Sequence, residues 1–129
     1  MTLDMYQERI MAHYERPYHF GELETPALDG HRHNPLCGDA VRIQASLDAE
    51  ERITEAYFQG VGCVISLAAA SILMEAVEGK SMAEIKAMTR QDMLDLLGIH
   101  LTAMRVKCAM LPLHTFVKAI HDYEAEAST

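Results

Sequence analysis

AVRIQASLDAEERITEAYFQG, residues 40–60, is the stretch that decides the fold. Apolar and polar side chains alternate over residues 40–48, which predicts a strand with one buried face. Residues 48–51 form a polar turn, and residues 52–60 predict a second strand. Two such strands joined by a short turn predict an antiparallel hairpin.

Helices are expected on the C-terminal side of this hairpin. Residues 64–77 are apolar nearly all round, which predicts a buried helix. Residues 81–88 and 89–98 each begin with a capping-box pattern, so two short helices are expected. A last helix is expected near residues 109–120, with its start delayed or kinked by Pro112.

The N-terminal part predicts one helix and one further strand. Residues 3–14 place apolar side chains on one face of a helix, which Pro17 ends. Residues 17–38 are rich in proline and glycine, so we expect a loop with a short edge strand near residues 27–31. The chain, residues 1–129, therefore predicts a single α+β domain in which helices pack on a small antiparallel three-stranded sheet.

Composition narrows the class of protein. A formal net charge of −8 disfavours binding to the phosphate backbone of nucleic acids. The most apolar stretch, residues 61–74, is too short to span a bilayer, so no membrane partner is expected. The sequence does not begin with a basic region followed by an apolar run, and three cysteines cannot all pair in disulfides. These features predict a cytoplasmic protein with free thiols.

Each of the three cysteines lies at a break in the predicted elements. Cys37 lies in a loop before the first hairpin strand, Cys63 at the start of the buried helix, and Cys108 at or near the start of the last helix. The positive end of a helix favours the thiolate, which is the form that binds metals and attacks sulfur. The absence of a Cys-x-x-Cys pair excludes a zinc knuckle or a ferredoxin-type run.

Asp39 adds a carboxylate two residues after Cys37. Three thiolates and this carboxylate would fill a tetrahedral zinc site, and sulfur ligands equally suit iron–sulfur chemistry. Two interpretations stay open from the residues alone. In one, all four side chains converge on a single ion. In the other, the cysteines are small buried side chains and Asp39 caps a turn.

Three further residues lie near this candidate site in the sequence. Lys107 precedes Cys108, where it would lower the pKa of that thiol or hold an anionic persulfide. His31 and His33 are either extra ligands or sensors, or solvated side chains of the loop.

Four motifs carry a family resemblance. In chain order they are HYERP at residues 13–17, NPLCGD at 34–39, FQGVGC at 58–63 and RVKC at 105–108. With these motifs the sequence resembles the iron–sulfur cluster assembly scaffold family, namely the IscU and SufU proteins and the N-terminal domain of NifU. The resemblance covers nearly the whole chain, and the motifs together are specific.

The resemblance implies an α+β fold with the cysteines gathered at one exposed end. It also implies that Cys37, Asp39, Cys63 and Cys108 hold iron or a [2Fe–2S] cluster in transit, with zinc as another occupant. The implied partners are a pyridoxal-phosphate-dependent cysteine desulfurase, which donates sulfur, and apo iron–sulfur proteins, which receive the cluster. We expect Cys37 and Cys108 to accept persulfide sulfur, with Lys107 in support.

Two departures from the family pattern concern the subfamily. Lys107 stands where the IscU branch carries histidine, as in the SufU branch. Residues 101–105, LTAMR, replace the Leu-Pro-Pro-Val-Lys segment of the IscU branch, so the resemblance gives no support for an Hsp70-type chaperone as a partner. The segment between Cys63 and Cys108 nevertheless lacks the insertion typical of SufU. The sequence therefore leaves the choice between IscU and SufU open.

Three functions compete at this point. The first is a scaffold on which a [2Fe–2S] cluster is built and passed on. The second is a zinc-dependent sulfur acceptor that stimulates a desulfurase and so has sulfurtransferase activity. The third is a structural zinc domain, against which Asp39 argues because structural zinc sites usually use cysteine and histidine. The scaffold, a carrier rather than a true enzyme, is the primary prediction.

Overall fold

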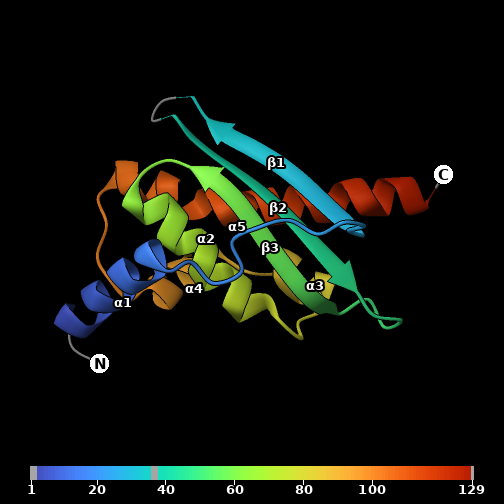
Figure 1. Cartoon of the computed structure of the whole chain (residues 1–129), viewed down its shortest axis with the longest axis horizontal. Helices are drawn as coiled ribbons and strands as arrows, with labels where there is room; N and C mark the ends of the chain where they lie inside the picture. The colour runs from blue at the N-terminus through green and yellow to red at the C-terminus, as the bar shows by residue number, and fades with distance from the viewer. Residues whose placement is uncertain (1–2, 36–37, 129) are drawn as a thin grey trace.

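A computed structural model describes residues 3–35 and 38–128 of the chain. Within them the α+β prediction is confirmed, because helices pack on a three-stranded antiparallel sheet in one small domain (Figure 1). The elements are, in order, α1 (Leu3–Glu15), β1 (Leu28–Asn34), β2 (Asp39–Leu47), β3 (Ile53–Val61), α2 (Val64–Val77), α3 (Met82–Lys86), α4 (Arg90–Leu97) and α5 (Ala103–Ala127). None of the helices described is long and apolar enough to cross a membrane.

The sheet has the order β1-β2-β3, so β2 is the central strand and both of its pairings are antiparallel. The alternation that predicted the hairpin is visible in the burial of β2, where Val41, Ile43 and Ala45 are at most 1% exposed. Ile43 pairs with Phe58 across the hairpin, and both side chains belong to the core. A register shift after Ser46 marks the end of regular pairing.

One face of the sheet is covered by helices. Helix α5 packs on β1 and β2, α2 packs on β3 and on α5, and α1 lies on α2 (Figure 1). Helix α2 lies between the sheet, α1 and α5. This position explains why its side chains are apolar nearly all round, as the sequence indicated. The largest fully buried side chains include Phe58, Leu73, Met74, Phe116 and Ile120.

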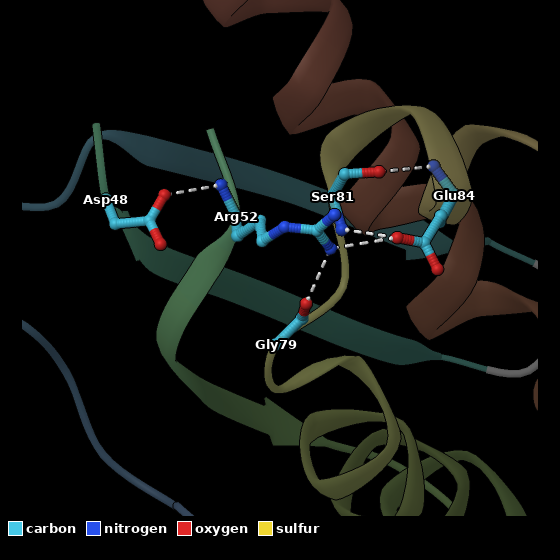
Figure 2. Close-up of polar contacts among 5 residues, drawn as sticks. All are labelled: Asp48, Arg52, Gly79, Ser81 and Glu84. Atoms are coloured by element: carbon cyan, nitrogen blue, oxygen red, sulfur yellow. Dashed lines mark hydrogen bonds and ion pairs between the residues drawn. The ribbon is translucent and has the colours of Figure 1, made fainter. Parts of the chain in front are cut away.

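The far end of the hairpin is tied to the start of α3 by polar contacts (Figure 2). Asp48 accepts the backbone N–H of Arg52 at 3.0 Å, and the Arg52 guanidinium donates to the Gly79 carbonyl at 3.1 Å and to Glu84 at 3.2 Å. Ser81 and Glu84 form the predicted capping box through bonds of 3.1 and 3.2 Å. Because the ion pair is exposed, these contacts act mainly by fixing where α3 begins.

The start of the last helix was predicted wrongly. Helix α5 begins at Ala103, where Thr102 caps it by accepting the backbone N–H of Arg105, and it continues through Pro112. A proline inside a helix costs about 3 kcal/mol. Here the apolar side of α5 is buried on both sides of Pro112, so we infer that tertiary packing outweighs this cost.

Replacing Gly30 with alanine should destabilise the contact between β1 and α5. A Cβ at residue 30 would lie 2.8 Å from both the Thr115 carbonyl oxygen and the Ala119 Cβ. We expect the free energy of unfolding to fall by about 1–3 kcal/mol, because overpacking outweighs the smaller entropic benefit of alanine. Urea denaturation measures the change. His31→Ala, an exposed substitution on the same strand, is the control, and an equal denaturation midpoint for both variants would contradict this packing argument.

Candidate metal centre

Three predicted site residues meet at one end of the molecule. Asp39 is the first residue of β2, Cys63 is the N-cap of α2, and Cys108 lies in the second turn of α5. One carboxylate oxygen and the two sulfur atoms all lie within 4.8 Å of one another. Figure 1 shows the end of β3, the start of α2 and the first turns of α5 at this end. Cys37, the fourth predicted ligand, falls outside the described residues.

Asp39 is held in place by the backbone at the start of α2. Its side chain is buried, and Oδ1 accepts the backbone N–H of Cys63 at 2.9 Å. Its Oδ2 lies 3.7 Å from the Cys63 sulfur. A buried carboxylate that accepts a hydrogen bond has a fixed orientation, so Asp39 presents an oxygen to the same space as the thiol.

Ser66 supports Cys63, a role the sequence analysis missed. Its backbone N–H donates to the Cys63 sulfur at 3.5 Å, and its hydroxyl donates to the Cys63 carbonyl at 3.1 Å and lies 3.8 Å from the sulfur. Its side chain is fully buried. An N-cap followed three residues later by a serine is the pattern that could have indicated it, since the cap side chain accepts the N–H of the third helical residue.

Gly62 leaves the space that the Asp39 carboxylate occupies. A Cβ at residue 62 would lie 2.3 Å from Asp39 Oδ1 and 2.9 Å from the Ser66 hydroxyl. Its φ of +150° is also a conformation that side-chain-bearing residues rarely adopt. The glycine is therefore required for the approach of β2 to the start of α2.

Cys108 lies near the start of its helix, as predicted, but in the second turn rather than at the first residue. Because α5 begins at Ala103, the positive end of its dipole lies one turn before Cys108, and the effect falls off within the first turn. Cys63, as the N-cap of α2, does have the position at a helix start that the sequence predicted. Cys108 is 2% exposed, whereas the neighbouring Lys107 is exposed.

The two histidines that were considered as extra ligands do not belong to the cluster of possible ligands among the described residues. His31 and His33 are exposed on β1, and the cluster of possible ligands among the described residues consists of Asp39, Cys63 and Cys108. This favours the interpretation of His31 and His33 as solvated side chains.

The donor set fits a soft metal or an iron–sulfur cluster. Ligand atoms around a tetrahedral zinc ion are about 3.3–3.8 Å apart, so separations of up to 4.8 Å require a contraction of about 1.5 Å at most. Thiolates favour zinc and iron–sulfur chemistry, and the carboxylate is the harder ligand of the set.

The sequence matches the NifU-like N terminal domain family over residues 5–129. The chain belongs to this family. It is 32% identical over 124 residues to the iron–sulfur cluster assembly scaffold protein IscU of Haemophilus influenzae, covering 94% of this chain and 97% of that protein. It is 30% identical to the protein of the same name from Escherichia coli, with 94% and 95% coverage.

The fold of this NifU-like domain also recurs in solved structures. One is a crystal structure from Fervidobacterium islandicum, described as a putative iron–sulfur cluster assembly scaffold protein for the SUF system. The two chains superpose with a TM-score of 0.73 and 24% identity, covering 92% of this chain and 99% of the other. At that identity the likeness supports the fold alone. The family resemblance drawn from the four motifs is confirmed by the family match and by the two IscU relatives.

Proposed function

We propose that this protein is an iron–sulfur cluster assembly scaffold that works in the cytoplasm. The observation that carries the proposal is the meeting of Asp39, Cys63 and Cys108 within 4.8 Å, in a chain that belongs to the NifU-like family. The names of the IscU relatives support the same role. In this proposal Cys37 completes the site, and its cargo is iron or a transient [2Fe–2S] cluster that passes to apo iron–sulfur proteins.

The residues divide the work by their chemistry. The thiolates bind the soft cargo strongly, whereas Asp39 is the weaker ligand and lets go first during transfer. Burial of Cys108 and half-burial of Cys63 keep water away from the sulfur atoms. Exposed Lys107 stands beside the site, where its cation attracts an anionic persulfide.

Sulfur enters from a pyridoxal-phosphate-dependent cysteine desulfurase in this proposal. The Cys37 thiolate attacks the outer sulfur of the desulfurase persulfide, the S–S bond of that persulfide breaks, and the desulfurase cysteine leaves as a thiolate. An external thiol reductant then supplies the two electrons that convert the transferred sulfur to sulfide. Cys37 is favoured over Cys108 because Cys108 is only 2% exposed, and attack needs access as well as thiolate.

The sulfur route predicts where a persulfide forms. After incubation of the metal-free protein with desulfurase and cysteine, peptide mass spectrometry should find the added sulfur at Cys37 first and at Cys108 second. Cys37→Ser should abolish the early product, while Cys63→Ser leaves it in place. A persulfide confined to Cys63 would contradict the proposed route.

Lys107 supports a second candidate, the zinc-dependent sulfur acceptor. A protonated lysine has no lone pair to donate, so the proposed site offers four ligands, which suffice for zinc. The test compares zinc-loaded and metal-free protein in a desulfurase assay and then attempts anaerobic cluster reconstitution on each. A visible-absorbing cluster that transfers to an apo-ferredoxin is expected. Strong stimulation by the zinc form, with no cluster on either form, would overturn the scaffold in favour of the sulfur acceptor.

A further inference from the structure

A positively charged groove runs along α5, starting beside the metal ligands and extending toward the C-terminal end of the helix. It consists of two adjoining hollows of about 380 and 490 Å³, which share Arg32, Arg90, Met110 and His114 in their walls. Helix α5 forms its floor, β1 contributes one wall, and the segment from α3 to α4 contributes the other. We call this feature the basic groove.

The charge of the basic groove is opposite to that of the whole chain. Five of the 11 lysines and arginines of a chain with net charge −8 line the two hollows, and the described lining contains neither aspartate nor glutamate. These five are Arg32, Lys86, Arg90, Lys107 and Lys118. A concave surface lined by one sign of charge concentrates its potential, so the groove attracts anionic groups.

Most of this charge is not neutralised by ion pairs among residues 3–35 and 38–128. Lys86 pairs with Glu124 at 2.8 Å, and Lys118 pairs with Asp122 at 3.2 Å, both near the C-terminal end of α5. Arg32, Arg90 and Lys107 form no ion pair with any residue in the part of the chain that the structure describes. Two arginines in the walls of the same hollows, without an acidic partner there, indicate that an anionic partner comes from outside.

The position of His114 fits a local excess of positive charge. Partial desolvation lowers the pKa of this exposed imidazole, and the positive charge of Arg32 lowers it further. His114 is therefore mostly neutral near pH 7, and it adds a hydrogen-bonding group to the groove.

The floor of the groove has the spacing of a helix-packing seam. Val106, Met110, Leu113 and Val117 follow one another at intervals of four, three and four residues along α5, which is the spacing of paired helices. Val106, Met110 and Leu113 belong to the hydrophobic core and are only 7%, 7% and 2% exposed, so the floor offers a small apolar area and the charges supply most of the attraction. From Val106 to Val117 the helix rises about 16 Å, which matches about three turns of an opposing helix.

We propose that the basic groove binds an acidic amphipathic helix of a partner protein. Its apolar side chains would lie on the floor, and its carboxylates would face Arg32 and Arg90. One end of the groove is formed by Asn34, Pro35 and Lys107, next to the metal ligands, so a bound helix would end beside the site. A nucleic acid is disfavoured because the net charge of the rest of the chain repels a long polyanion.

The test uses the metal-free protein, so its outcome does not depend on the proposed scaffold function. The probe is a fluorescent synthetic peptide of about 14 residues, long enough to span the groove, with leucine at coiled-coil spacing and glutamate on its flanks. A matched peptide carries glutamine in place of every glutamate. We expect the acidic peptide to bind about tenfold more tightly at low salt and the difference to shrink as salt screens the charges.

Variants then locate the binding site. The double variant Arg32→Gln, Arg90→Gln should weaken binding of the acidic peptide about tenfold, whereas Arg16→Gln, an exposed charge on another part of the surface, should change it less than about twofold. Amide shifts of the labelled wild-type protein should move along β1 and residues 106–118. Equal binding of both peptides, equal loss in the Arg16 variant, shifts confined elsewhere, or preference for heparin or anionic lipid vesicles would each overturn the proposal.

Discussion

Replacing Gly62 with alanine is expected to cause the largest loss of stability among the substitutions considered. The new Cβ would lie 2.3 Å from Asp39 Oδ1, and the backbone conformation at residue 62 is itself strained for alanine. The Asp39 carboxylate would have to leave the Cys63 N–H, so a buried polar group would lose that hydrogen bond. We expect the free energy of unfolding to fall by about 2–4 kcal/mol, measured by urea denaturation.

Gly79 provides a matched control for this substitution. It also has a positive φ, of +81°, but apart from its chain neighbours no described residue has an atom within 4 Å of the Cβ that alanine would add. Gly79→Ala therefore measures backbone strain alone, at about 1 kcal/mol. Cluster reconstitution should fail in Gly62→Ala and proceed in Gly79→Ala. Similar losses of stability and normal reconstitution in both variants would show that the approach of Gly62 to Asp39 is unimportant.

Asp39→Ala is expected to slow the release of cargo by about an order of magnitude, because it removes the weakest ligand of the set. In the proposed site the carboxylate is the hardest and weakest ligand, so it opens first when the cargo moves to an acceptor. Without it the cargo keeps only thiolate ligands. The measurement is the rate of cluster transfer to apo-ferredoxin, followed by circular dichroism in the visible range.

Asp39→Asn separates the ligand role from the structural role. The asparagine side-chain oxygen can still accept the Cys63 N–H, so the start of α2 keeps its hydrogen bond while the negative charge is lost. The Asp39→Asn variant should release the cluster slowly, as the alanine variant does, but with a stability closer to that of the wild type. Transfer as fast as in the wild type, or faster, in both variants would exclude a release function for Asp39.

The secondary structure could be predicted from local patterns because each pattern has a local cause. Alternation over residues 40–48 reflects a strand with one face on the core, and the capping boxes at Ser81 and Thr89 are present in the structure as expected. The prediction failed at Pro112. The rule that proline disrupts a helix predicted a late or kinked start, but the buried helix α5 continues through this residue. The packing of α5 on the sheet involves residues that are far apart in the sequence. A local sequence pattern therefore could not show that this packing outweighs the cost of the proline.

The candidate site was predicted by residue type but not by geometry. Spacing alone could not bring Asp39, Cys63 and Cys108 together, because they belong to one strand and two different helices that are far apart in the sequence. The family motifs selected the residues, and the structure supplies the contacts among them. The basic groove could not be predicted from the composition, because a net charge of −8 gives the sum of the charges and not their distribution over the surface.

The site is assembled from β2, α2 and α5, so the protein can hold its cargo only while these three elements are packed together. Asp39 and Cys63 are 24 positions apart, and Cys108 is farther still along the chain, so the donor atoms converge only in the closed tertiary structure. An ion that binds only this state stabilises it by about 2.7 kcal/mol at a free concentration one hundred times its Kd. By the same linkage, a separation of α5 from α2 would dissolve the site, so substitutions that loosen the packing of these two helices are expected to shorten the residence time of the cargo in addition to any effect at Asp39.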